Sequence, residues 1–395
     1  MGPVNDTPAA RKITVSFAPL PGDNELAVLW QGLERRSVVS GFNSWPWTRT
    51  WLATLPANLK PELMLAHAGA ELVAGAIVVR RGVRRRRFLA IPSWFLHTTG
   101  EEEHNSLCIE HNGLLVAEQH RLAVWRTLLE EFHNARRNAA ELYLHGVNIE
   151  VAQLAQTLGF GLRETGRLPV RHVELEGVRQ HPQGLRGLLR HSTRKTLRRT
   201  EESLLESCGD IAIETAGTAL EAGAFLDELR ELHERRWAQH ESGGAFAPGY
   251  FLKFHRTLID TMFASGLVQM LRVRAGNTTV AVLYNLVWQQ VAYAYQSGIN
   301  YSLVGKTLSP GMLAHVRAID LCAKLGLHRY DLLAGDSQYK QILGTPHTEL
   351  WWGSVQNRRP ALLLEAAMEK FVRYARRRLQ QLRGRKPEQS QVAGQ

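Results

Sequence analysis

The sequence predicts a mixed α/β protein that contains two copies of one fold. Short apolar stretches of strand length alternate with longer stretches of helical periodicity, an order that is typical of α/β proteins. A hairpin pattern also occurs twice. Ala68-Gly69 and Ala275-Gly276 mark the two turns, and the apolar pairs before and after them have identical spacing. A repeat of whole supersecondary units indicates two tandem domains, each with a central mixed sheet flanked by helices.

The composition is sufficient for sizeable hydrophobic cores, and the net charge favours anionic partners. The chain has 395 residues, of which 44% are hydrophobic, and this length predicts two or three domains. Its 48 Lys and Arg residues outnumber its 37 Asp and Glu residues, which gives a formal net charge of +11. A nucleotide cofactor, a nucleic acid or a membrane surface would each suit this charge.

The three cysteines show neither the spacing of a metal site nor that of a disulfide framework. We therefore expect no metal and a reducing, cytoplasmic location. The first residues lack the apolar core of a signal peptide. No apolar run reaches the roughly 18 residues that a spanning helix needs. The sequence does not indicate an oligomeric state.

The first domain is predicted at residues 13–177, after a disordered tail at residues 1–12. Its expected elements are helices at 23–35 and 44–51, strands at 62–66, 72–79 and 88–95, a helix at 114–137, a strand at 141–144, a helix at 149–158 and a strand at 168–175. Three tryptophans of the second helix are expected to wedge it into a core. The arginines at 84–87 indicate a solvated hairpin tip, with peripheral contact to an anionic membrane as the alternative.

The second domain is predicted at residues 178–382, before a disordered tail at residues 383–395. Its expected elements are a basic helix at 190–199, a strand at 211–214, helices at 220–239 and 250–263, strands at 267–273, 279–288 and 291–297, a helix at 309–325, strands at 329–333 and 349–355, and a helix at 360–382.

The turn Ser309-Pro310-Gly311 begins a predicted helix whose start is free of bulky side chains. Ser309 suits the N-cap, and Pro310 suits the first helical position because no N–H is needed there. A helix N-terminus that directly follows a strand can bind an anion, because free N–H groups and the helix dipole both face the charge. The pattern equally fits an ordinary capped helix.

Two further stretches carry candidate contacts for the acceptor substrate. On the basic helix, Arg194 and Arg198 are four residues apart and share a face, which suits either a solvated linker helix or a surface that binds phosphate. The glycine-containing loop at 241–249 could gate an acceptor or simply connect two helices. Trp237 and Tyr250 flank this loop and are the candidate acceptor contacts.

The last strand–helix unit differs between the two halves. In the second half it reads Tyr330-Asp-Leu-Leu-Ala-Gly-Asp-Ser-Gln-Tyr-Lys340, whereas the equivalent helix at 149–158 has no tyrosine and no Ser-Pro-Gly start. We therefore predict that the second half holds the site. The first half would be a non-catalytic partner that supports the fold or shapes the acceptor site.

These motifs resemble the GNAT acyltransferase superfamily, in its branch of FemAB-like and CelD-like (cellulose-biosynthesis type) acetyltransferases. The stretches that carry the resemblance are Tyr295-Gln-Ser297, Ser309-Pro-Gly-Met-Leu313, Tyr330-Asp-Leu-Leu333, Gly335-Asp-Ser-Gln-Tyr-Lys340 and the basic Ser192–Arg199. The resemblance covers roughly residues 13–380. It implies acetyl-CoA or another acyl-CoA as co-substrate, held in a fork between two parallel strands, with its pyrophosphate on the following helix N-terminus.

The resemblance also implies roles for individual residues. The acyl-CoA contacts would be Tyr295, Ser297, Lys306, Ser309, Gly311 and Met312. Direct acyl transfer needs a base, an oxyanion donor and an acid. Asp331 and Asp336 are the candidate bases, although Asp336 equally suits a helix cap. Tyr339 is the candidate acid, and Lys340 would pair with a carboxylate or a phosphate.

Two other functions fit the same sequence. A Fem-type aminoacyl transferase would draw on aminoacyl-tRNA, for which the basic helix and the net charge would serve. A non-catalytic binding module of a polysaccharide-synthesis assembly would explain why the usual glycine-rich pyrophosphate loop of the superfamily is missing. For the acyltransferase, the acceptor would be a small molecule or a polysaccharide precursor with an amine or hydroxyl. Cell-envelope or exopolysaccharide biosynthesis is the setting that the family suggests.

Overall fold

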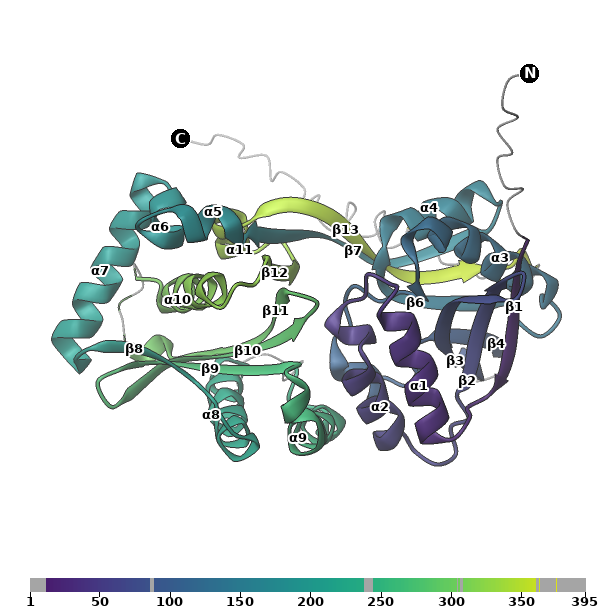
Figure 1. The fold of residues 1–395 in the computed structure, drawn as a ribbon, viewed down its shortest axis with the longest axis horizontal. Helices are drawn as coiled ribbons and strands as arrows, with labels where there is room; N and C mark the ends of the chain where they lie inside the picture. The colour runs from purple at the N-terminus through teal and green to yellow at the C-terminus, as the bar shows by residue number, and fades with distance from the viewer. Residues whose placement is uncertain are drawn as a thin grey trace, which may run out of the picture.

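A single β-sheet runs through the whole molecule. The computed structural model describes residues 12–85, 89–237, 244–303, 305, 308–359, 362 and 374. Within them the strand order is β1-β2-β3-β4-β6-β13-β7-β12-β11-β10-β9-β8, and the short β5 pairs with β3 outside this path. Figure 1 shows the sheet crossing two lobes, with helices packed on both of its faces in the lobe that holds β8–β12.

The strands have the following bounds: β1 Ile13–Pro19, β2 Glu62–Ala68, β3 Glu71–Arg85, β4 Leu89–Leu96, β5 Leu115–Val116, β6 Glu141–Asn148, β7 Gly161–Glu174, β8 Ile211–Thr215, β9 Val268–Ala275, β10 Thr278–Trp288, β11 Val291–Ile299, β12 Arg329–Ala334 and β13 Thr345–Gln356. The α-helices are α1 Asp23–Glu34, α2 Trp45–Thr54, α3 Arg121–Asn134, α4 Ile149–Thr157, α5 Leu175–Gln180, α6 Gly184–Leu188, α7 His191–Cys208, α8 Ala219–Trp237, α9 Gly249–Met262, α10 Pro310–Lys324 and α11 Gln338–Leu343.

The two halves repeat the same arrangement, as the spacing of the hairpins predicted. Strands β1–β4 and β8–β11 are antiparallel series, and each ends in one parallel pair, β4 with β6 and β11 with β12. The turn glycines Gly69 and Gly276 both have positive φ. Their N–H groups donate to Lys12 and Asp210, which precede β1 and β8 by one residue. The mixed α/β fold with two halves of the same arrangement is thus confirmed.

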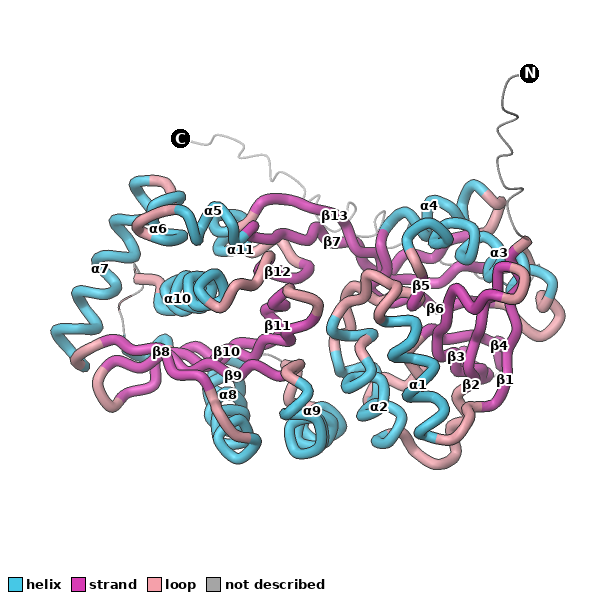
Figure 2. The backbone as a smooth tube through the Cα atoms, viewed as in Figure 1, coloured by secondary structure: helices cyan, strands magenta, loops and turns pink. Residues whose placement is uncertain are grey.

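The halves are joined by an exchange of strands. The long β7 leaves the first half and pairs with β12 of the second, while β13 returns from the second half and lies between β6 and β7. Figure 2 shows both strands running side by side from one lobe to the other. The predicted boundary at residues 177 and 178 falls inside α5, and strand pairing crosses it in both directions.

Three large apolar cores lie within the described residues. One belongs to each half, and a third lies between α1–α2 of the first half and α8–α9 of the second. The tryptophans of α2 are buried in this third core, as predicted, and Trp47 packs on Phe254 with ring centroids 4.7 Å apart. The contact between the halves is therefore an apolar interior, which we expect to hold them in a fixed relation.

Several elements differ from the sequence prediction. The edge strand β1 was not predicted. One of its faces is exposed and the other is only partly buried, so its apolar pattern is weak. The predicted helix at 114–137 begins only at Arg121, since Leu115 and Val116 pair with β3 instead. The predicted tail at 383–395, residues 1–11 of the first tail, and all of the helix at 360–382 except residues 362 and 374 lie outside the described residues.

None of the helices in the described part of the chain has the length and apolar character needed to cross a membrane. All three cysteines are free thiols.

Candidate active site

The second half contains a fork between two parallel strands. Strands β11 and β12 pair at only three positions, the last of which joins Tyr293 to Asp331. Beyond this point β11 continues to Ile299 and pairs only with β10, whereas β12 remains paired with β7. Among the described strands, none pairs with the fork-facing edge of β11 after Tyr293. Ser297 lies on this segment and is half-buried.

A loop from the first half reaches this fork. We call residues 104–114, between β4 and β5, the connecting loop. Its Glu110 carboxylate accepts a 2.5 Å hydrogen bond from the N–H of Ala334, the last residue of β12. The hydroxyl of Tyr295, on β11, donates to the Leu107 carbonyl over 2.6 Å. The connecting loop thus contacts both strands of the fork.

Asp331 and His111 form a buried ion pair beside the fork. Asp331 Oδ2 lies 3.1 Å from His111 Nε2, and Asp331 Oδ1 accepts from the Leu333 N–H over 2.7 Å. Burial would raise the pKa of Asp331, but His111 and the Leu333 N–H together hold it below its usual value. Burial would lower the pKa of His111, and Asp331 raises it instead. Asp331, a predicted base, is therefore held as a stable anion with little tendency to take a proton.

Glu110 has the protonation behaviour of a general base. Burial raises its pKa to about 7, although the Ala334 N–H, Lys340 and His111 act in the other direction. The Lys340 ammonium donates to the Ala334 carbonyl over 2.6 Å and to the Leu333 carbonyl over 3.3 Å. Burial also lowers the pKa of Lys340, against the pull of Glu110 and Asp331. The hydrogen bonds of Lys340 thus go to main-chain carbonyls, and its pairing with a carboxylate or a phosphate stays a prediction.

The end of β12 is bent to present these groups. Leu333 has φ of 61° and Gly335 has φ of 134°, both in the left-handed region, and the pairing of β12 with β7 shifts between Asp331 and Ala334. A bulge of this kind redirects main-chain groups at the end of a strand. Here it turns the Ala334 N–H toward Glu110 and two carbonyls toward Lys340.

Tyr295 supports the connecting loop through a buried hydrogen-bond chain. Because its hydroxyl donates to Leu107, His255 Nε2 must donate to Tyr295, and His255 Nδ1 accepts from Tyr284, each over 3.0 Å. Burial lowers the pKa of His255 to about 3, so the ring is neutral, as this chain requires. The side chain of Tyr295, a predicted acyl-CoA contact, is thus occupied in the core and fixes the loop that carries Glu110.

The equivalent fork of the first half is closed. Strands β4 and β6 last pair at Phe95 and Tyr143. Just beyond, the Asn112 side chain donates to the Leu96 carbonyl over 3.1 Å, and its N–H donates to the Gly146 carbonyl over 2.9 Å. Asn112 is buried and bridges the two strands where the second half leaves a gap.

The helix that follows β11 begins as predicted, but with a different cap. Pro310 is at the first helical position, and Met312 is buried in the core. The Ser309 side chain makes no cap hydrogen bond. Its N–H donates to Thr200 Oγ1 on α7 over 3.1 Å instead. A side chain added at Gly311 would make only ordinary contact with Ile299, 3.4 Å away. Lys306 lies outside the described residues.

Tyr339 and Asp336 lie at the start of α11 in different surroundings. Tyr339 stacks on His315 of α10, with ring centroids 4.9 Å apart, and burial raises its pKa to about 12. It therefore keeps its proton at neutral pH and can act as an acid. Asp336 is exposed, accepts from the Gln341 side chain over 2.8 Å and lies 3.7 Å from Arg171. This placement is that of a local hydrogen-bonding group at the start of a short helix.

The predicted acceptor contacts do not come together. Arg194 and Arg198 lie on α7, where Arg198 is exposed and pairs with Glu202 over 3.5 Å. Trp237 is half-buried and stacks on His233. Tyr250 is buried, and its hydroxyl lies 3.0 Å from Thr54 Oγ1 of the first half. Tyr250 thus joins the two halves, and its side chain is not offered to an acceptor.

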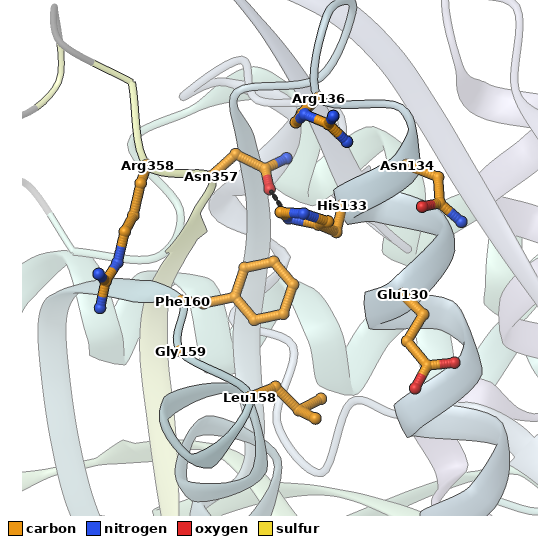
Figure 3. A pocket seen from close by; sticks show the side chains of 9 residues that line it. All are labelled: Glu130, His133, Asn134, Arg136, Leu158, Gly159, Phe160, Asn357 and Arg358. Carbon is orange, nitrogen blue, oxygen red and sulfur yellow. Dashed lines mark hydrogen bonds between the residues drawn. The ribbon is translucent and has the colours of Figure 1, made fainter.

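A separate hollow lies in the first half and shares no residue with the fork. It has a volume of about 250 Å³ and is lined by the ends of α3 and β13 and by the turn after α4. Figure 3 shows Phe160 beneath His133, whose Nδ1 lies 3.2 Å from Asn357 Oδ1. His133 and Asn357 are already bonded to each other, and no strand fork opens there. We therefore place the chemistry at the fork.

Comparison with known proteins identifies the class to which this arrangement belongs. Residues 191–341 match the family model described as an acetyltransferase (GNAT) domain. No protein of curated function matches the sequence. A structure of FemX has a TM-score of 0.54 at 9% identity, over 88% of this chain and 99% of that chain.

Two other structures are similar over the same length. A conserved protein of unknown function from Bacteroides thetaiotaomicron VPI-5482 has a TM-score of 0.50 at 11% identity, over 87% of this chain and 100% of that chain. A tandem GNAT protein from the clavulanic acid biosynthesis pathway has a TM-score of 0.46 at 11% identity, over 87% of this chain and 98% of that chain.

The chain therefore contains a GNAT acetyltransferase domain in its second half. Over most of its length the chain also has a fold similar to that of FemX. The matched segment includes the fork, α10 and most of α11. Glu110 and His111 lie outside it, in the first half.

Glu110, His111 and Asn112 were not among the residues that the sequence singled out. They form no motif, and they lie between the predicted strand at 88–95 and the predicted helix at 114–137, where no element is expected. Glu110 and His111 contact residues more than two hundred positions away, and Asn112 contacts Leu96 and Gly146 across the sheet. A single sequence carries no signal for these contacts. Part of the connecting loop does contain Asn112-Gly113, a common turn pair.

Proposed function

We propose that this protein is an acyltransferase that moves an acetyl or other acyl group from acyl-CoA to an amine or hydroxyl acceptor. The observation that carries the proposal is the fork between β11 and β12, with the half-buried carboxyl of Glu110, whose pKa burial raises to about 7, held at its edge. The fit to acyl-CoA rests on the unpaired edge of β11, which can bond the amides of an extended pantetheine arm. The start of α10, where Gly311 has no side chain, can accept its pyrophosphate.

The residues of the fork supply the proton transfers that the reaction needs. Glu110 takes a proton from the acceptor as its nitrogen or oxygen attacks the thioester carbonyl. The carbon–sulfur bond then breaks, and Tyr339 gives its proton to the departing thiolate. Lys340 holds Glu110 in place and stabilises its charged form. Main-chain N–H groups near Ser297 are the candidates to stabilise the oxyanion.

The acceptor is proposed as a class. A carboxylate base serves an amine or a hydroxyl equally well, and both occur in the precursors of cell-envelope and exopolysaccharide synthesis. We propose a cytoplasmic location, which agrees with three thiols that are all free. No group of three or more His, Cys, Asp and Glu side chains in the described part of the chain is arranged to hold a metal ion. The proposed mechanism uses none.

Calorimetric titration with acetyl-CoA tests this proposal. We expect binding in the micromolar range, and we expect Gly311→Asp to weaken it at least 10-fold, because the new charge repels the pyrophosphate. An acidic residue in the first turn favours the helix itself, so the loss would not come from unfolding. Gly22→Asp, at the start of α1 with open space around it, is the matched control. Failure of the wild type to bind acetyl-CoA would refute the proposal.

One observation favours a second candidate, a Fem-type aminoacyl transferase. The exposed side of α7 carries Arg190, His191, Lys195, Arg198 and Arg199, a row that suits the phosphates of tRNA. The FemX likeness concerns the fold alone. Filter binding with bulk tRNA at several salt concentrations separates the two candidates. Firm binding that weakens steeply with salt, together with no binding of acetyl-CoA, would favour aminoacyl transfer.

A further inference from the structure

The outer side of α7 carries a concentration of positive charge. We define the basic face of α7 by its exposed or half-buried cations, which are Arg190, Arg194, Lys195, Arg198 and Arg199. No acidic residue occurs in the sequence between Glu176 and Glu201. Figure 1 shows α7 at the outer margin of the lobe that holds β8–β12, on the side away from the first half. The basic face is therefore presented to any surface that approaches this end of the molecule.

The charges of the basic face are not neutralised within the protein. Of its five cations, only Arg198 has an acidic partner among the described residues, the exposed Glu202 at 3.5 Å. Glu201 of the same helix pairs instead with Arg186 and Arg317, over 2.6 Å and 2.8 Å. An exposed pair such as Arg198–Glu202 contributes little to stability and exchanges readily. The basic face is therefore available to an anionic partner.

The opposite side of α7 is packed into the fold. Its buried residues are Thr193, Leu197, Thr200 and Leu204, and the two leucines belong to the core of the second half. The Thr200 hydroxyl also accepts the hydrogen bond from the Ser309 N–H. Because this inner side is fixed by packing, the basic face keeps one direction relative to the rest of the second half.

Two exposed leucines lie at the ends of the basic face. Leu188 precedes α7 and is 54% exposed, and Leu205 lies in the last turn of α7 and is 53% exposed. Leu205 follows Arg198 by seven residues, which is about two helical turns, so both side chains project from the same side of the helix. Cations flanked by exposed aliphatic side chains suit a partner that is anionic at its surface and apolar beneath it.

A lipid bilayer accounts for this combination better than a nucleic acid does. The phosphates of a nucleic acid would pair with the cations and leave both leucines in water. Recognition of unpaired RNA bases relies on aromatic side chains, and residues 175–208 contain no Phe, Tyr or Trp. An anionic bilayer attracts Lys and Arg to its surface and takes up apolar side chains at the boundary between headgroups and acyl chains. Both features of α7 then have a partner.

We propose that α7 docks the protein onto an anionic membrane surface. The helix has 18 residues, is about 27 Å long and lies along the surface. The basic face contacts the lipid headgroups, and Leu188 and Leu205 enter the boundary beneath them. Binding is peripheral and reversible, because it depends on a few charges and two side chains. The proposal does not depend on the acyl-CoA function given above.

Co-sedimentation of the full chain with vesicles tests the role of the charges. Vesicles of phosphatidylglycerol and phosphatidylcholine in equal parts should bind the protein, and vesicles of phosphatidylcholine alone should not. Lys195→Gln with Arg198→Gln should weaken binding about 25-fold, because each cation near an anionic bilayer contributes about 5-fold. The matched control, Arg137→Gln with Arg235→Gln, removes the same charge from two exposed arginines elsewhere, of which Arg235 is paired with Glu231. Equal losses in the two double variants would overturn the assignment to α7.

A second pair of variants tests the apolar contact and separates a membrane from RNA. Leu188→Gln with Leu205→Gln should weaken vesicle binding about 5-fold or more, because the leucines no longer leave water. Leu122→Gln with Leu220→Gln, at positions 54% and 86% exposed, is the matched control and should bind as the wild type does. All four positions are exposed, so thermal unfolding should be unchanged. Wild-type vesicle binding by the Leu188 and Leu205 variant, or binding of tRNA without binding of anionic vesicles, would overturn the proposal.

Discussion

Glu110 and the residues around it illustrate how burial sets the chemistry of a single carboxyl group. A carboxyl with a pKa of about 7 is half ionised at neutral pH, so it can accept a proton and release it again. Asp331, equally close to the fork, is held as an anion by His111. The two carboxyls differ because Glu110 has a main-chain N–H and a lysine nearby, whereas Asp331 has a histidine in direct contact.

Glu110→Gln should lower kcat by about 10²–10⁴-fold, the usual contribution of a general base. Because only the ionised form of Glu110 can take a proton, wild-type activity should rise with pH through about 7. The variant should lack this rise. Steady-state kinetics from pH 5.5 to 8.5 measure both effects. Asp336→Asn tests the other candidate base. If Asp336→Asn lowers kcat strongly and Glu110→Gln does not, Asp336 is the base.

The buried pair of Asp331 and His111 should stabilise the fold. Asp331→Asn leaves His111 without its partner and should lower the free energy of unfolding by about 3 kcal/mol, as measured by urea denaturation. Glu231→Gln, which breaks an exposed pair with Arg235, should change it little. An equal effect in the two variants would show that the buried pair does not stabilise the fold.

The pH dependence of this effect follows from the two pKa shifts. The contribution of Asp331 is present above the usual aspartate pKa of about 3.9 and is lost as the pH falls through its lowered folded value. The contribution of His111 is present below about 6.5 and is lost as the pH rises through its raised folded value. The difference between wild type and Asp331→Asn should therefore be largest between about pH 4 and 6.5.

At the scale of elements, the connecting loop decides which fork is open. It closes the first fork with Asn112 and supplies Glu110 to the second. Gly146 of β6 makes this possible, because a side chain there would lie 2.6 Å from the Ile109 carbonyl. The prediction that the second half holds the site rested on α10 and α11, and this loop gives it a structural basis. In our proposal the first half also contributes a reacting group, Glu110, which revises its predicted non-catalytic role.

Asn112→Ala should destabilise the protein by about 1–2 kcal/mol, because the buried Leu96 carbonyl loses its partner. The change should also lower kcat without changing the affinity for acetyl-CoA, since Glu110 moves while the fork and α10 stay in place. Thermal unfolding measures the loss of stability, steady-state kinetics measure kcat, and calorimetry measures the affinity for acetyl-CoA. Asn277→Ala, in an exposed turn, is the control. A changed acetyl-CoA affinity with normal kcat would mean that the loop shapes the fork and does not position Glu110.

Elements with a strong local pattern were predictable from the sequence, and those fixed by distant partners were not. The strands β9–β12 and the helix α10 have clear periodicity and turn residues, and the structure places them within a few residues of the predicted bounds. Leu115 and Val116 form β5 only because β3 lies beside them. The Ser309 side chain makes no cap hydrogen bond, and the Ser309 N–H donates to Thr200 of α7, a contact that the local sequence does not indicate. Local sequence patterns predict that a helix or strand exists, and tertiary contacts determine where it begins and ends.

At the scale of the whole molecule, the exchange of β7 and β13 makes each half depend on the other. Without the second half, β6 loses β13, and β7 loses both of its neighbours. Long unpaired strand edges promote association with other chains. The third core would also be exposed, including Trp47 and Phe254. The two GNAT-like halves are therefore repeats in sequence but a single unit in folding.

We therefore expect that residues 1–177 and residues 178–395, produced separately, will aggregate or fail to give cooperative unfolding. Produced together, they should form a 1:1 complex on size-exclusion chromatography, because both strands remain present and the cut lies in the short α5. The complex should bind acetyl-CoA, and residues 178–395 alone should have no acyl transfer activity, since Glu110 is missing. If residues 178–395 alone fold and retain full activity, then neither the exchanged strands nor the connecting loop has the role described here.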